Sequence, residues 1–422
     1  MEDKLLALMF QPERWERALN IGLDKDINMA DLRKLNEPDT RIQLYRQIKA
    51  NQYNIIPPHA QLIPKDKPGE YRTVYINENV DRVLLSIANE ILFETCPDMI
   101  HPACKSYQTG IGCGKVVQEC SRKIANANGE VIGWKADLSK YFDSVPIEFI
   151  DLVFDEVEKR NGKSAVINML RRYYHQNICF DTDGNVQQKY MSLMQGCAVA
   201  SFLADALLYE RDERMTELNE FYVRYSDDTL YIGRNYSAAM EIMCSELGKR
   251  GLKLNPKKVE YLDSNHWFRF LGFSIRGTDI SISKGRLDTF QKEIEGRTIK
   301  RQNVTLRKAT KDVVKYLYVG DGTYSWATSV LPIVTNKHDI NELNKFVLDC
   351  LKGVATNRKK VGGLGYQKEG KYGVVMRGKG KNVKANRDKI PDKIPGYLSI
   401  GMMRKAMLTS KETFETLVRC EL

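Results

Sequence analysis

The sequence predicts an α+β fold with more than one domain. Strand-like and helix-like segments interleave without the strict β-α-β-α rhythm of a parallel sheet, which favours antiparallel strands packed against helices. A chain of 422 residues is long enough for two or three domains with a real core. Its hydrophobic fraction of 42% and charged fraction of 28% are typical of a folded globular protein rather than a disordered one.

The N-terminal part combines helices with one hairpin. Residues 1–60 read as helical and polar-rich, and this region ends near Pro57–Pro58. Residues 63–76 (IPKDKPGEYRTVYI) contain a Pro-Gly turn that enters an alternating strand. Residues 79–96 have apolar positions spaced as on one helical face, so we expect a long helix there.

The central part alternates between strands and helices. Residues 130–145 (EVIGWKADLSKYFDSV) predict an apolar strand, a turn and the start of a helix. An amphipathic helix is expected at 201–218 and another helix at 237–251. The remaining strand patterns are a strand–turn–strand at 221–233 (FYVRYSDDTLYIG), KLNPKKVEYL at 253–262 and FRFLGFSI at 268–275.

The C-terminal part is more helical and more basic. The chain has 65 basic and 54 acidic residues, a net charge of +11 that favours an anionic partner such as nucleic acid. Residues 356–389 hold eleven Lys or Arg and two acids, so this segment carries +9 of that charge. We interpret it as a loop or hairpin that contacts phosphate backbones; the alternative is a solvated basic loop. The RNA-binding candidates are Arg358, Lys359, Lys360, Lys371, Arg377, Lys379 and Lys381, with Tyr366 and Tyr372 as stacking candidates. Residues 390–422 have helical periodicity and no motif that we can interpret.

Cysteine usage and hydropathy indicate a cytoplasmic protein. Nine cysteines are scattered with no C-x-x-C pair, which favours reduced thiols over a disulfide framework or a zinc site. No stretch approaches the ~20 apolar residues of a membrane span. The apolar run near the start is too short and too flanked by charge for a signal peptide. We therefore expect no membrane association.

Two adjacent acids, Asp227 and Asp228, lie at the tip of the predicted hairpin. Like charges repel, but divalent cations turn that repulsion into ligation. Asp137, at the end of an apolar strand, is the candidate third carboxylate. Two Mg²⁺ ions ~3.5–4 Å apart could then activate a 3′-hydroxyl and stabilise the leaving pyrophosphate. The alternative for Asp227 and Asp228 alone is a turn with solvated acids.

The order of these motifs resembles the palm of reverse transcriptases. DLSKYFD, MQGCAVASFLAD, YSDD, GLKLNPKK and FLGF follow one another as in that family, over roughly residues 60–275 and to about 350 with the thumb. The resemblance implies a right-hand polymerase with an antiparallel palm sheet and a helical thumb. It implies fingers at 1–130 with a triphosphate-gripping hairpin at 63–76, a palm at 131–278, a thumb at 279–355 and a basic RNA-contacting extension at 356–422.

The resemblance also assigns the metal ligands and the general acid. Asp137 and Asp227 would be the principal ligands of two Mg²⁺ ions, with Asp228 beside them and the Leu138 carbonyl as an extra oxygen ligand. Lys258 would protonate the pyrophosphate, with Lys257 an equal rival and a surface lysine as the alternative.

Five further positions would hold the nucleotide. Lys65 and Arg72 flank the Pro-Gly turn, a spacing suited to placing both cations over one triphosphate, unless they are simply an exposed basic hairpin. Phe142 would lie beneath the incoming sugar and exclude a 2′-hydroxyl, unless it fills a core. Gln195 and Gly196 would contact the sugar and base pair without reading sequence. FLGF (270–273) would present the primer end.

Some features depart from the family pattern. The loop SLMQGCAVAS lacks the usual proline before Gln-Gly and the serine-proline after it, and HPACKSYQTGIGCG (101–114) only loosely resembles the Gly-Phe-Arg stretch. No integrase, endonuclease, RNase H or zinc-knuckle signature follows the thumb. These traits are similar to those of the compact bacterial "unknown group" reverse transcriptases, many of which are antiphage defence enzymes that copy a partner noncoding RNA. The retron motifs Asn-Ala-x-x-His and Val-Thr-Gly are not found, and a group II maturase would carry a fuller DNA-binding tail.

The expected function is RNA-directed DNA synthesis from deoxynucleoside triphosphates on a bound noncoding RNA, giving a DNA product. Three alternatives stay open. One is template-independent or protein-primed synthesis by the same palm, another is a reverse transcriptase of the diversity-generating branch, and the last is an RNA-binding scaffold with an inert palm. Asp137, Asp227 and Asp228 argue against the scaffold, because grouping three acidic side chains is energetically costly and an inert palm would have no reason to keep them.

Overall fold

The computed structural model describes residues 2–24, 27–65, 69–108, 110–125, 132–263, 266–321, 324–367, 374–377 and 394–421. The chain forms two compact units. Unit 1 comprises Met1–Gln108 and Gly133–Tyr261, and unit 2 comprises Thr109–Ile132 and Leu262–Leu422. The predicted boundaries of fingers, palm, thumb and extension stay a prediction.

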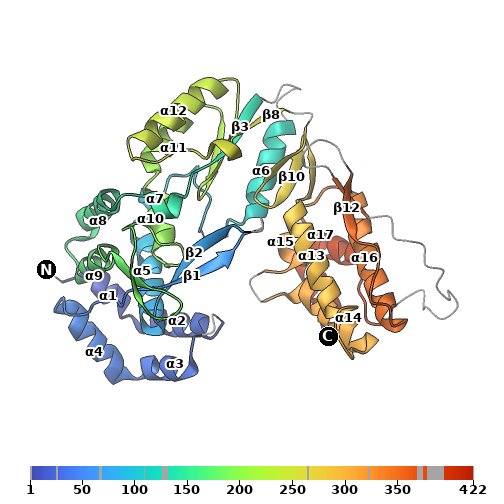
Figure 1. The fold of residues 1–422 in the computed structure, drawn as a ribbon, viewed down its shortest axis with the longest axis horizontal. Coiled ribbons are helices and arrows are strands. Elements are labelled where there is room, and N and C mark those ends of the chain that lie inside the picture. The colour runs from blue at the N-terminus through green and yellow to red at the C-terminus, as the bar shows by residue number, and fades with distance from the viewer. Residues whose placement is uncertain are drawn as a thin grey trace. The chain divides into compact units, whose positions relative to one another are not determined.

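The helices of unit 1 surround one apolar helix, α5. Residues Asn79–Thr95 form α5, as predicted, and its Leu84, Leu85 and Ile91 are buried. Helices α1, α2 and α3 pack against it (Figure 1). The other helical elements of unit 1 are α1 (Lys4–Met9), α2 (Pro12–Asp24), α3 (Met29–Asn36), α4 (Pro38–Lys49), η1 (Pro97–Met99), α7 (Tyr141–Ser144), α8 (Ile147–Asn161), α9 (Ala165–Tyr174), α10 (Ala200–Ala206), α11 (Tyr209–Thr216), α12 (Tyr236–Gly248) and η2 (Pro256–Lys258).

Two four-stranded sheets frame this unit. The first has the order β2-β1-β4-β5 and contains the predicted fingers hairpin, in which β1 (His59–Pro64) and β2 (Tyr71–Ile76) are antiparallel. Its other strands are β4 (Ile178–Phe180) and β5 (Val186–Gln188). The second has the order β6-β7-β3-β8, and β7 is antiparallel to both β6 and β3. Its strands are β3 (Ile132–Asp137), β6 (Phe221–Tyr225), β7 (Asp228–Ile232) and β8 (Glu260–Asp263).

Two sequence predictions for this unit need correction. The single helix expected at 201–218 is two helices, α10 and α11, separated at Leu207–Leu208. Both leucines are buried, and the break lets α11 turn the charged Arg211 and Asp212 into the interior. The strand expected over 253–262 begins at Glu260, because Pro256 starts the short helix η2 and the Asn255 side chain caps it.

Unit 2 combines a small sheet with helices. Strands β9 (Phe268–Phe270), β10 (Phe273–Arg276) and β11 (Asp279–Ile282) are antiparallel neighbours, so the strands predicted at 268–275 form a hairpin. Phe290 and Trp326 pack edge to face in its core, with ring centroids 4.5 Å apart. Its other elements are α6 (Cys113–Ala125), α13 (Lys284–Arg297), α14 (Leu306–Val314), the π-helix η3 (Lys315–Val319), α15 (Trp326–Ser329), α16 (Lys337–Ala355), β12 (Leu364–Gln367), β13 (Val374–Arg377), α17 (Ile400–Thr409) and α18 (Lys411–Glu421).

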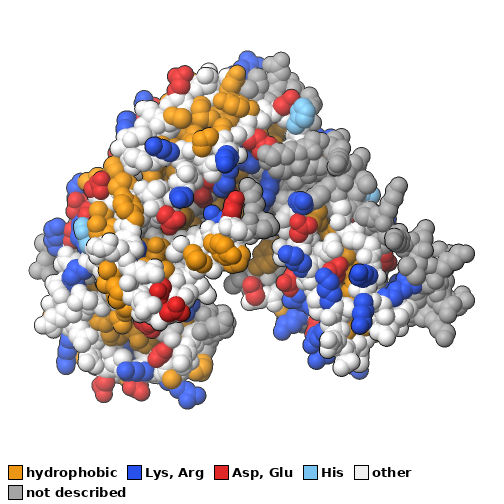
Figure 2. Space-filling model, in the orientation of Figure 1, with side chains coloured by type: hydrophobic (Ala, Val, Ile, Leu, Met, Phe, Trp, Pro, Cys, Tyr) orange, Lys and Arg blue, Asp and Glu red, His pale blue; other side chains and the backbone are white. Residues whose placement is uncertain are grey.

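Basic side chains are prominent on the visible face of unit 2, over the helices that follow the small sheet (Figure 2). In the described ranges, no helix combines the length and the apolar character that crossing a lipid bilayer would require.

Candidate active site

The antiparallel register of β3 and β7 brings two of the predicted carboxylates together. Asp137, the last residue of β3, lies directly opposite Asp228, the first residue of β7. Residues opposite each other in antiparallel strands have their side chains on the same face of the sheet. Two acids separated by some ninety residues of sequence are therefore cross-strand neighbours.

Asp227 lies in the tight turn between β6 and β7. Tyr225 and Asp228 form the last pair of that hairpin, which leaves Ser226 and Asp227 as its two central residues. Ser226 has φ 57°, the left-handed conformation that two-residue hairpin turns demand of their first central residue. Burial, together with the nearby charges of Asp137 and Asp228, raises the pKa of Asp227 to about 6. The three predicted acids therefore interact electrostatically.

Lys258 is brought to the same place by the short helix η2. Its Nζ is 2.6 Å from Asp137 Oδ2, although Lys258 and Lys257 are both exposed. Asn255 fixes this segment, since its backbone N–H donates to the Asp137 carbonyl at 2.8 Å. Of the two lysines that the sequence left as equal candidates, Lys258 is the one at the carboxylates.

The backbone around Leu138 orients another oxygen. Leu138 forms a bridge with Leu254, flanked by the Asn255 bond to Asp137 and by a 2.8 Å bond from Ser139 N–H to the Lys253 carbonyl. Leu138 and Leu254 thus form a non-hydrogen-bonded antiparallel pair, in which the N–H and C=O of each residue point away from the other. The Leu138 carbonyl is therefore directed toward the β7 side, where Asp228 begins, and its role as a metal ligand stays a prediction.

The donor set at this edge fits divalent cations. Among the described residues, no three His, Cys, Asp or Glu side chains are arranged as a metal cluster, and the Lys258 ammonium bonds Asp137 instead. Burial and the two neighbouring carboxylates raise the pKa of Asp227, so a cation held among these groups would stabilise its charged form. Hard cations prefer such oxygen ligands, so Asp137, Asp227 and Asp228 are the residues that would hold Mg²⁺. A bound metal would supply charge stabilisation for phosphoryl transfer.

We expect Asp227→Asn to stabilise the metal-free protein. A carboxyl whose pKa is about 6 when folded and 3.8 when unfolded binds more protons in the folded state over that range. The contribution of the Asp227 carboxyl to the free energy of unfolding is therefore complete below the unfolded pKa. It is lost as the pH rises through 6. At pH 7 the loss is about 2–3 kcal/mol, and an amide escapes it. Urea unfolding in EDTA should show the gain at pH 7 and its disappearance near pH 4. An Asn variant less stable than wild type at pH 7 would contradict this account.

The fingers hairpin carries both predicted triphosphate-binding cations on one face. Arg72 pairs with Ile63, and Lys65 follows Ile63 by two residues, so their side chains share a face. Val74 is on that face too, and its Cγ1 lies 2.7 Å from where a Cβ on Gly196 would be. Lys65 is also close enough to Asp143 of α7 to oppose the rise in pKa that burial imposes on that carboxyl. Binding of a triphosphate by Lys65 and Arg72 stays a prediction.

Gln195 and Gly196 contact the same hairpin. The Gln195 carbonyl accepts a 2.7 Å hydrogen bond from the Tyr75 N–H on the outer edge of β2. Gly196 has φ 106°, and a Cβ there would lie 2.6 Å from the Tyr75 carbonyl. The close approach expected of this glycine is thus made to β2. Its contact with a nucleotide stays a prediction.

Phe142 lies on the short helix α7, which starts four residues after Asp137. The ring is half-buried against the core of unit 1. Its neighbour Tyr141 anchors the helix by donating to the Ala204 carbonyl at 2.7 Å. The Phe142 carbonyl accepts from Ser192 Oγ at 3.0 Å, so the backbone that carries the ring is fixed to the loop that leads to Gln195.

A buried ionic network lies behind the turn that carries Asp227, and sequence reasoning did not identify it. Arg224 of β6 is fully buried and pairs with Asp212 at 2.6 Å and with Asp205 at 3.3 Å. Arg211, also fully buried, pairs with Asp212 at 2.9 Å. Burial raises the pKa of Asp205, while the Arg224 charge opposes that rise. Its signal in the sequence is a single charge inside each of two apolar stretches, SFLADALL and FYVRY.

This network binds both the backbone N–H and the backbone carbonyl of Ser226. Ser106 Oγ accepts from the Ser226 N–H at 2.9 Å and donates to Asp205 at 2.6 Å. Arg224 Nη1 donates to the Ser226 carbonyl at 3.4 Å. The Tyr107 hydroxyl is 3.2 Å from Ser226 Oγ. Ser106, Arg224 and Asp205 are positioning residues for the turn that presents Asp227.

We expect Ser106→Ala to slow the expected nucleotide incorporation without unfolding the protein. The change leaves the buried Ser226 N–H without its acceptor, a cost of about 1–3 kcal/mol, and loosens the left-handed turn. A misplacement of the order of an ångström at a reacting group lowers kcat about 10²-fold. Steady-state incorporation assays should show this fall in kcat with little change in KM.

Ser164→Ala is the matched control for that variant. Ser164 is buried and caps α9 by accepting from the Val166 N–H at 3.1 Å. Its loss should cost about 1 kcal/mol with kcat unchanged. An equal kcat in Ser106→Ala and wild type would show that the network does not position the turn.

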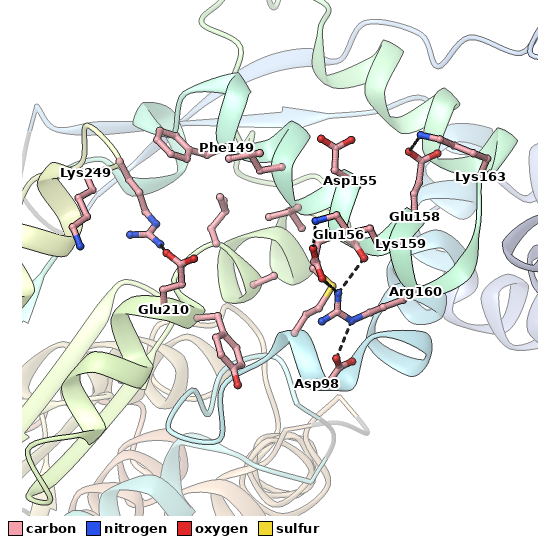
Figure 3. A pocket seen from close by; sticks show the side chains of 17 residues that line it. Asp98, Phe149, Asp155, Glu156, Glu158, Lys159, Arg160, Lys163, Glu210 and Lys249 are labelled. Carbon is pink, nitrogen blue, oxygen red and sulfur yellow. Dashed lines mark hydrogen bonds and ion pairs between the residues drawn. The ribbon is translucent and has the colours of Figure 1, made fainter.

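A cavity of about 1000 Å³ also lies in unit 1, apart from these groups. Figure 3 shows its charged rim, where Arg160 bonds Asp98 at 2.8 Å and Lys163 bonds Glu158 at 2.8 Å. None of the predicted site residues lines this cavity. Its charged side chains are ion-paired, some with one another and others with neighbours such as Arg171 and Glu246, and we assign it no role.

The RNA-binding candidates are only partly described. Arg358 is half-buried just beyond α16, where its N–H donates to the Gly353 carbonyl at 2.7 Å, and Lys359 and Lys360 are exposed. Arg377 and Tyr366 lie on the paired strands β13 and β12, so a hairpin is present in this segment as expected. Lys371, Tyr372, Lys379 and Lys381 lie outside the described residues.

An antiparallel sheet that presents three acids, beside a hairpin that presents two cations, defines the palm of a nucleic-acid polymerase. Residues 63–275, just over half of the chain, match the family model of the reverse transcriptase (RNA-dependent DNA polymerase). The chain therefore belongs to the reverse transcriptase family, a family of nucleotidyltransferases. The predicted fold class, an α+β right-hand polymerase with an antiparallel palm sheet, is confirmed.

Solved structures similar to this chain include telomerases. Telomerase from Candida albicans in complex with a TWJ fragment of telomeric RNA is 11% identical over 73% of this chain and 63% of its own, with a TM-score of 0.42. Apo telomerase from Candida tropicalis is 11% identical over 72% of this chain and 58% of its own, with a TM-score of 0.46. The chain thus spans about three-fifths of the telomerase chains that it matches. No curated protein matches it.

Proposed function

We propose that this chain is an RNA-directed DNA polymerase that copies a bound noncoding RNA with deoxynucleoside triphosphates. Membership of the reverse transcriptase family supports the reaction class. The observation that carries the proposal is the pairing of Asp137 with Asp228 beside the Asp227 turn, since this is the arrangement that two-metal nucleotidyl transfer needs. The predicted metal is Mg²⁺, as two ions.

The residues of this chain would divide the work. Lys65 and Arg72 would hold the triphosphate oxygens, Arg72 as a fork and Lys65 as a point charge. Lys258 would donate a proton to the departing pyrophosphate, and its present bond to Asp137 keeps the ammonium within reach of the site. Phe142 would exclude the 2′-hydroxyl and so select deoxynucleotides.

The biological setting is proposed from the resemblance alone. The compact bacterial reverse transcriptases that this chain resembles include many antiphage defence enzymes, and we propose a cytoplasmic ribonucleoprotein of that kind. The basic segment 356–389 and the thumb would dock a structured RNA. Such docking should weaken steeply with salt, because phosphate contacts release counterions.

The test is a primer-extension assay on the protein purified with its bound nucleic acid. The co-purified RNA is sequenced, and labelled deoxynucleotides and Mg²⁺ are added with and without RNase. Incorporation that RNase removes, giving a product complementary to the bound RNA, is the expected result. Incorporation that RNase leaves untouched would replace templated copying with untemplated or protein-primed synthesis. Absence of incorporation with RNA still bound would leave an RNA-binding scaffold.

A further inference from the structure

A second cavity, of about 550 Å³, lies within unit 2. It is bounded by the end of α13, by the junction of α14 with the π-helix η3, and by the loop that precedes α15. None of the predicted site residues lines it. Its volume lies within the ~300–1,000 Å³ that is typical of small-molecule sites. Its lining combines cations with phenol rings, namely Arg297, Arg301, Lys315, Tyr316 and Tyr324.

The two arginines of this cavity keep hydrogen-bond donors for a ligand. Arg297 stacks on the Tyr316 ring, 4.3 Å from its centroid, and its Nη1 bonds Glu293. Arg301 bonds Asp312 at 2.5 Å, also through Nη1. Among the described residues, no other hydrogen bond or ion pair engages either guanidinium. A guanidinium has five N–H donors in a fork that fits phosphate oxygens, so most of these donors remain available.

Lys315 and Tyr316 supply further donors. Lys315 is exposed and, in the part of the chain that the structure describes, forms no ion pair. The Tyr316 hydroxyl accepts from Trp326 Nε1 at 3.0 Å, which leaves its own proton for an acceptor. Burial raises the pKa of Tyr316 to about 12, so that proton stays in place at neutral pH. The lining is therefore rich in donors and suits an anionic ligand.

The backbone beside the cavity adopts uncommon conformations. Residues 315–319 form the π-helix η3, whose wide turn ends in a 2.8 Å hydrogen bond from the Gly320 N–H to the Lys315 carbonyl. Gly320 has φ 68°, and a Cβ there would lie 1.7 Å from the Tyr324 carbonyl oxygen, so only glycine fits. Asp321 closes the loop by accepting from the Tyr324 N–H at 2.7 Å. Turns of π-helix are frequent at functional sites, and this one fixes Tyr324 beside the cavity.

We propose that this cavity binds a nucleoside phosphate, in addition to the nucleotide that the palm would use as substrate. The base would lie on the Tyr324 ring, which is 40% exposed, since aromatic side chains stack on any base. The phosphate would be held by the Lys315 ammonium and by the remaining donors of Arg297 and Arg301. Such a ligand is either a free nucleotide or an unpaired nucleotide of a bound RNA. The site goes beyond the proposed polymerase activity and does not depend on it.

The test measures binding of AMP, GMP, CMP and UMP by isothermal titration calorimetry in EDTA, with ribose 5-phosphate as the comparison. EDTA removes divalent metal, so binding through Mg²⁺ at the carboxylates does not contribute. At least one of the nucleotides should bind about tenfold more tightly than ribose 5-phosphate, because base stacking adds to the phosphate contact. Lys315→Gln and Tyr324→Ala should each weaken that binding about tenfold, through loss of a charge-assisted contact and of the stacking ring.

Lys311→Gln and Tyr261→Ala are the matched controls. Lys311 is exposed one helical turn before Lys315 and does not line the cavity, and Tyr261 is an exposed tyrosine of unit 1. They remove the same charge and the same ring, and each should leave nucleotide affinity within about twofold of wild type. If no nucleotide binds more tightly than ribose 5-phosphate, or if the Lys315 and Tyr324 variants bind like wild type, the proposal is overturned.

An unstructured RNA of ~6 nucleotides distinguishes the two sources of the ligand. If this RNA displaces the bound nucleotide and binds less tightly to Lys315→Gln and Tyr324→Ala, the site takes an unpaired nucleotide of RNA. If it neither displaces the nucleotide nor responds to these substitutions, the site takes a free nucleotide.

The proposed polymerase activity is tested separately. Asp227→Asn should bind the nucleotide in EDTA as wild type does and incorporate no deoxynucleotide when Mg²⁺ is added. If wild type incorporates nothing yet Lys315 and Tyr324 still govern nucleotide binding, the site stands and the polymerase proposal falls. If incorporation proceeds and both variants bind the nucleotide like wild type, the polymerase proposal stands and the site falls.

Discussion

Asp227→Asn is expected to lower deoxynucleotide incorporation by about 10³-fold or more. An amide cannot provide the second anionic oxygen that a divalent cation needs, and metal stabilisation of phosphoryl transfer is worth several kcal/mol. The variant should nevertheless fold well, because the wild-type carboxyl is destabilised by burial and by the charges of Asp137 and Asp228. Single-turnover incorporation at saturating deoxynucleotide measures the effect.

The control is Asp183→Asn in the exposed turn between β4 and β5. This change also removes one negative charge from unit 1, so it tests whether net charge alone matters. It should leave the incorporation rate within about twofold of wild type, as surface substitutions usually do. If Asp227→Asn kept more than about a tenth of wild-type activity, Asp227 would not be a principal ligand, since losing a ligand costs more than one factor of ten.

The grouping of Asp137, Asp227 and Asp228 could be predicted for two reasons. Each acid lies in a local strand-end pattern, and the motifs that carry them follow one another along the chain in an informative order. An apolar stretch ending in Asp137 and a hairpin tip at Asp227 and Asp228 each identify a strand end. Sequence alone does not give the register between β3 and β7, because long-range pairing is set by the packing of whole faces. The order of the motifs along the chain, rather than local sequence patterns, indicated that these strands bring their acids together.

The groups behind that edge could not be predicted in the same way. Asp205, Arg224 and Ser106 lie on three segments, and each is an isolated polar residue until the fold pairs them. Gly196 packs against the backbone of Tyr75, a residue of strand β2, and its contact with a nucleotide stays a prediction. Such contacts are tertiary, so no spacing rule reveals them.

The same limit explains the two lysines of η2. Lys257 and Lys258 are equivalent on spacing, and the rotation of about 120° per residue in a 3₁₀ helix separates their directions. The direction is set by Asn255, which both caps η2 through the Lys257 N–H at 3.2 Å and bonds the Asp137 backbone. A capping residue thus decides which cation meets the carboxylates.

Phe142→Ala is expected to relax discrimination against ribonucleotides by about 10–100-fold. An apolar pocket rejects a larger substrate by about 1–3 kcal/mol, and removing the ring removes that rejection. The backbone of Phe142 is fixed by Ser192 and by the Tyr141 anchor, so the space opened by the change should stay where the ring was. The ratio of kcat/KM for each deoxynucleotide to that for its ribonucleotide measures the effect.

Phe149→Ala controls for the loss of apolar packing. Phe149 is likewise half-buried against the core of unit 1, but it lines the cavity shown in Figure 3 and not the carboxylate edge. Both variants should lose comparable stability, and only Phe142→Ala should change the sugar preference. Equal discrimination in the two variants would reduce Phe142 to a core residue. Selection of deoxynucleotides would then have to come from another group, even though the Asp137, Asp227 and Asp228 assignment would be unaffected.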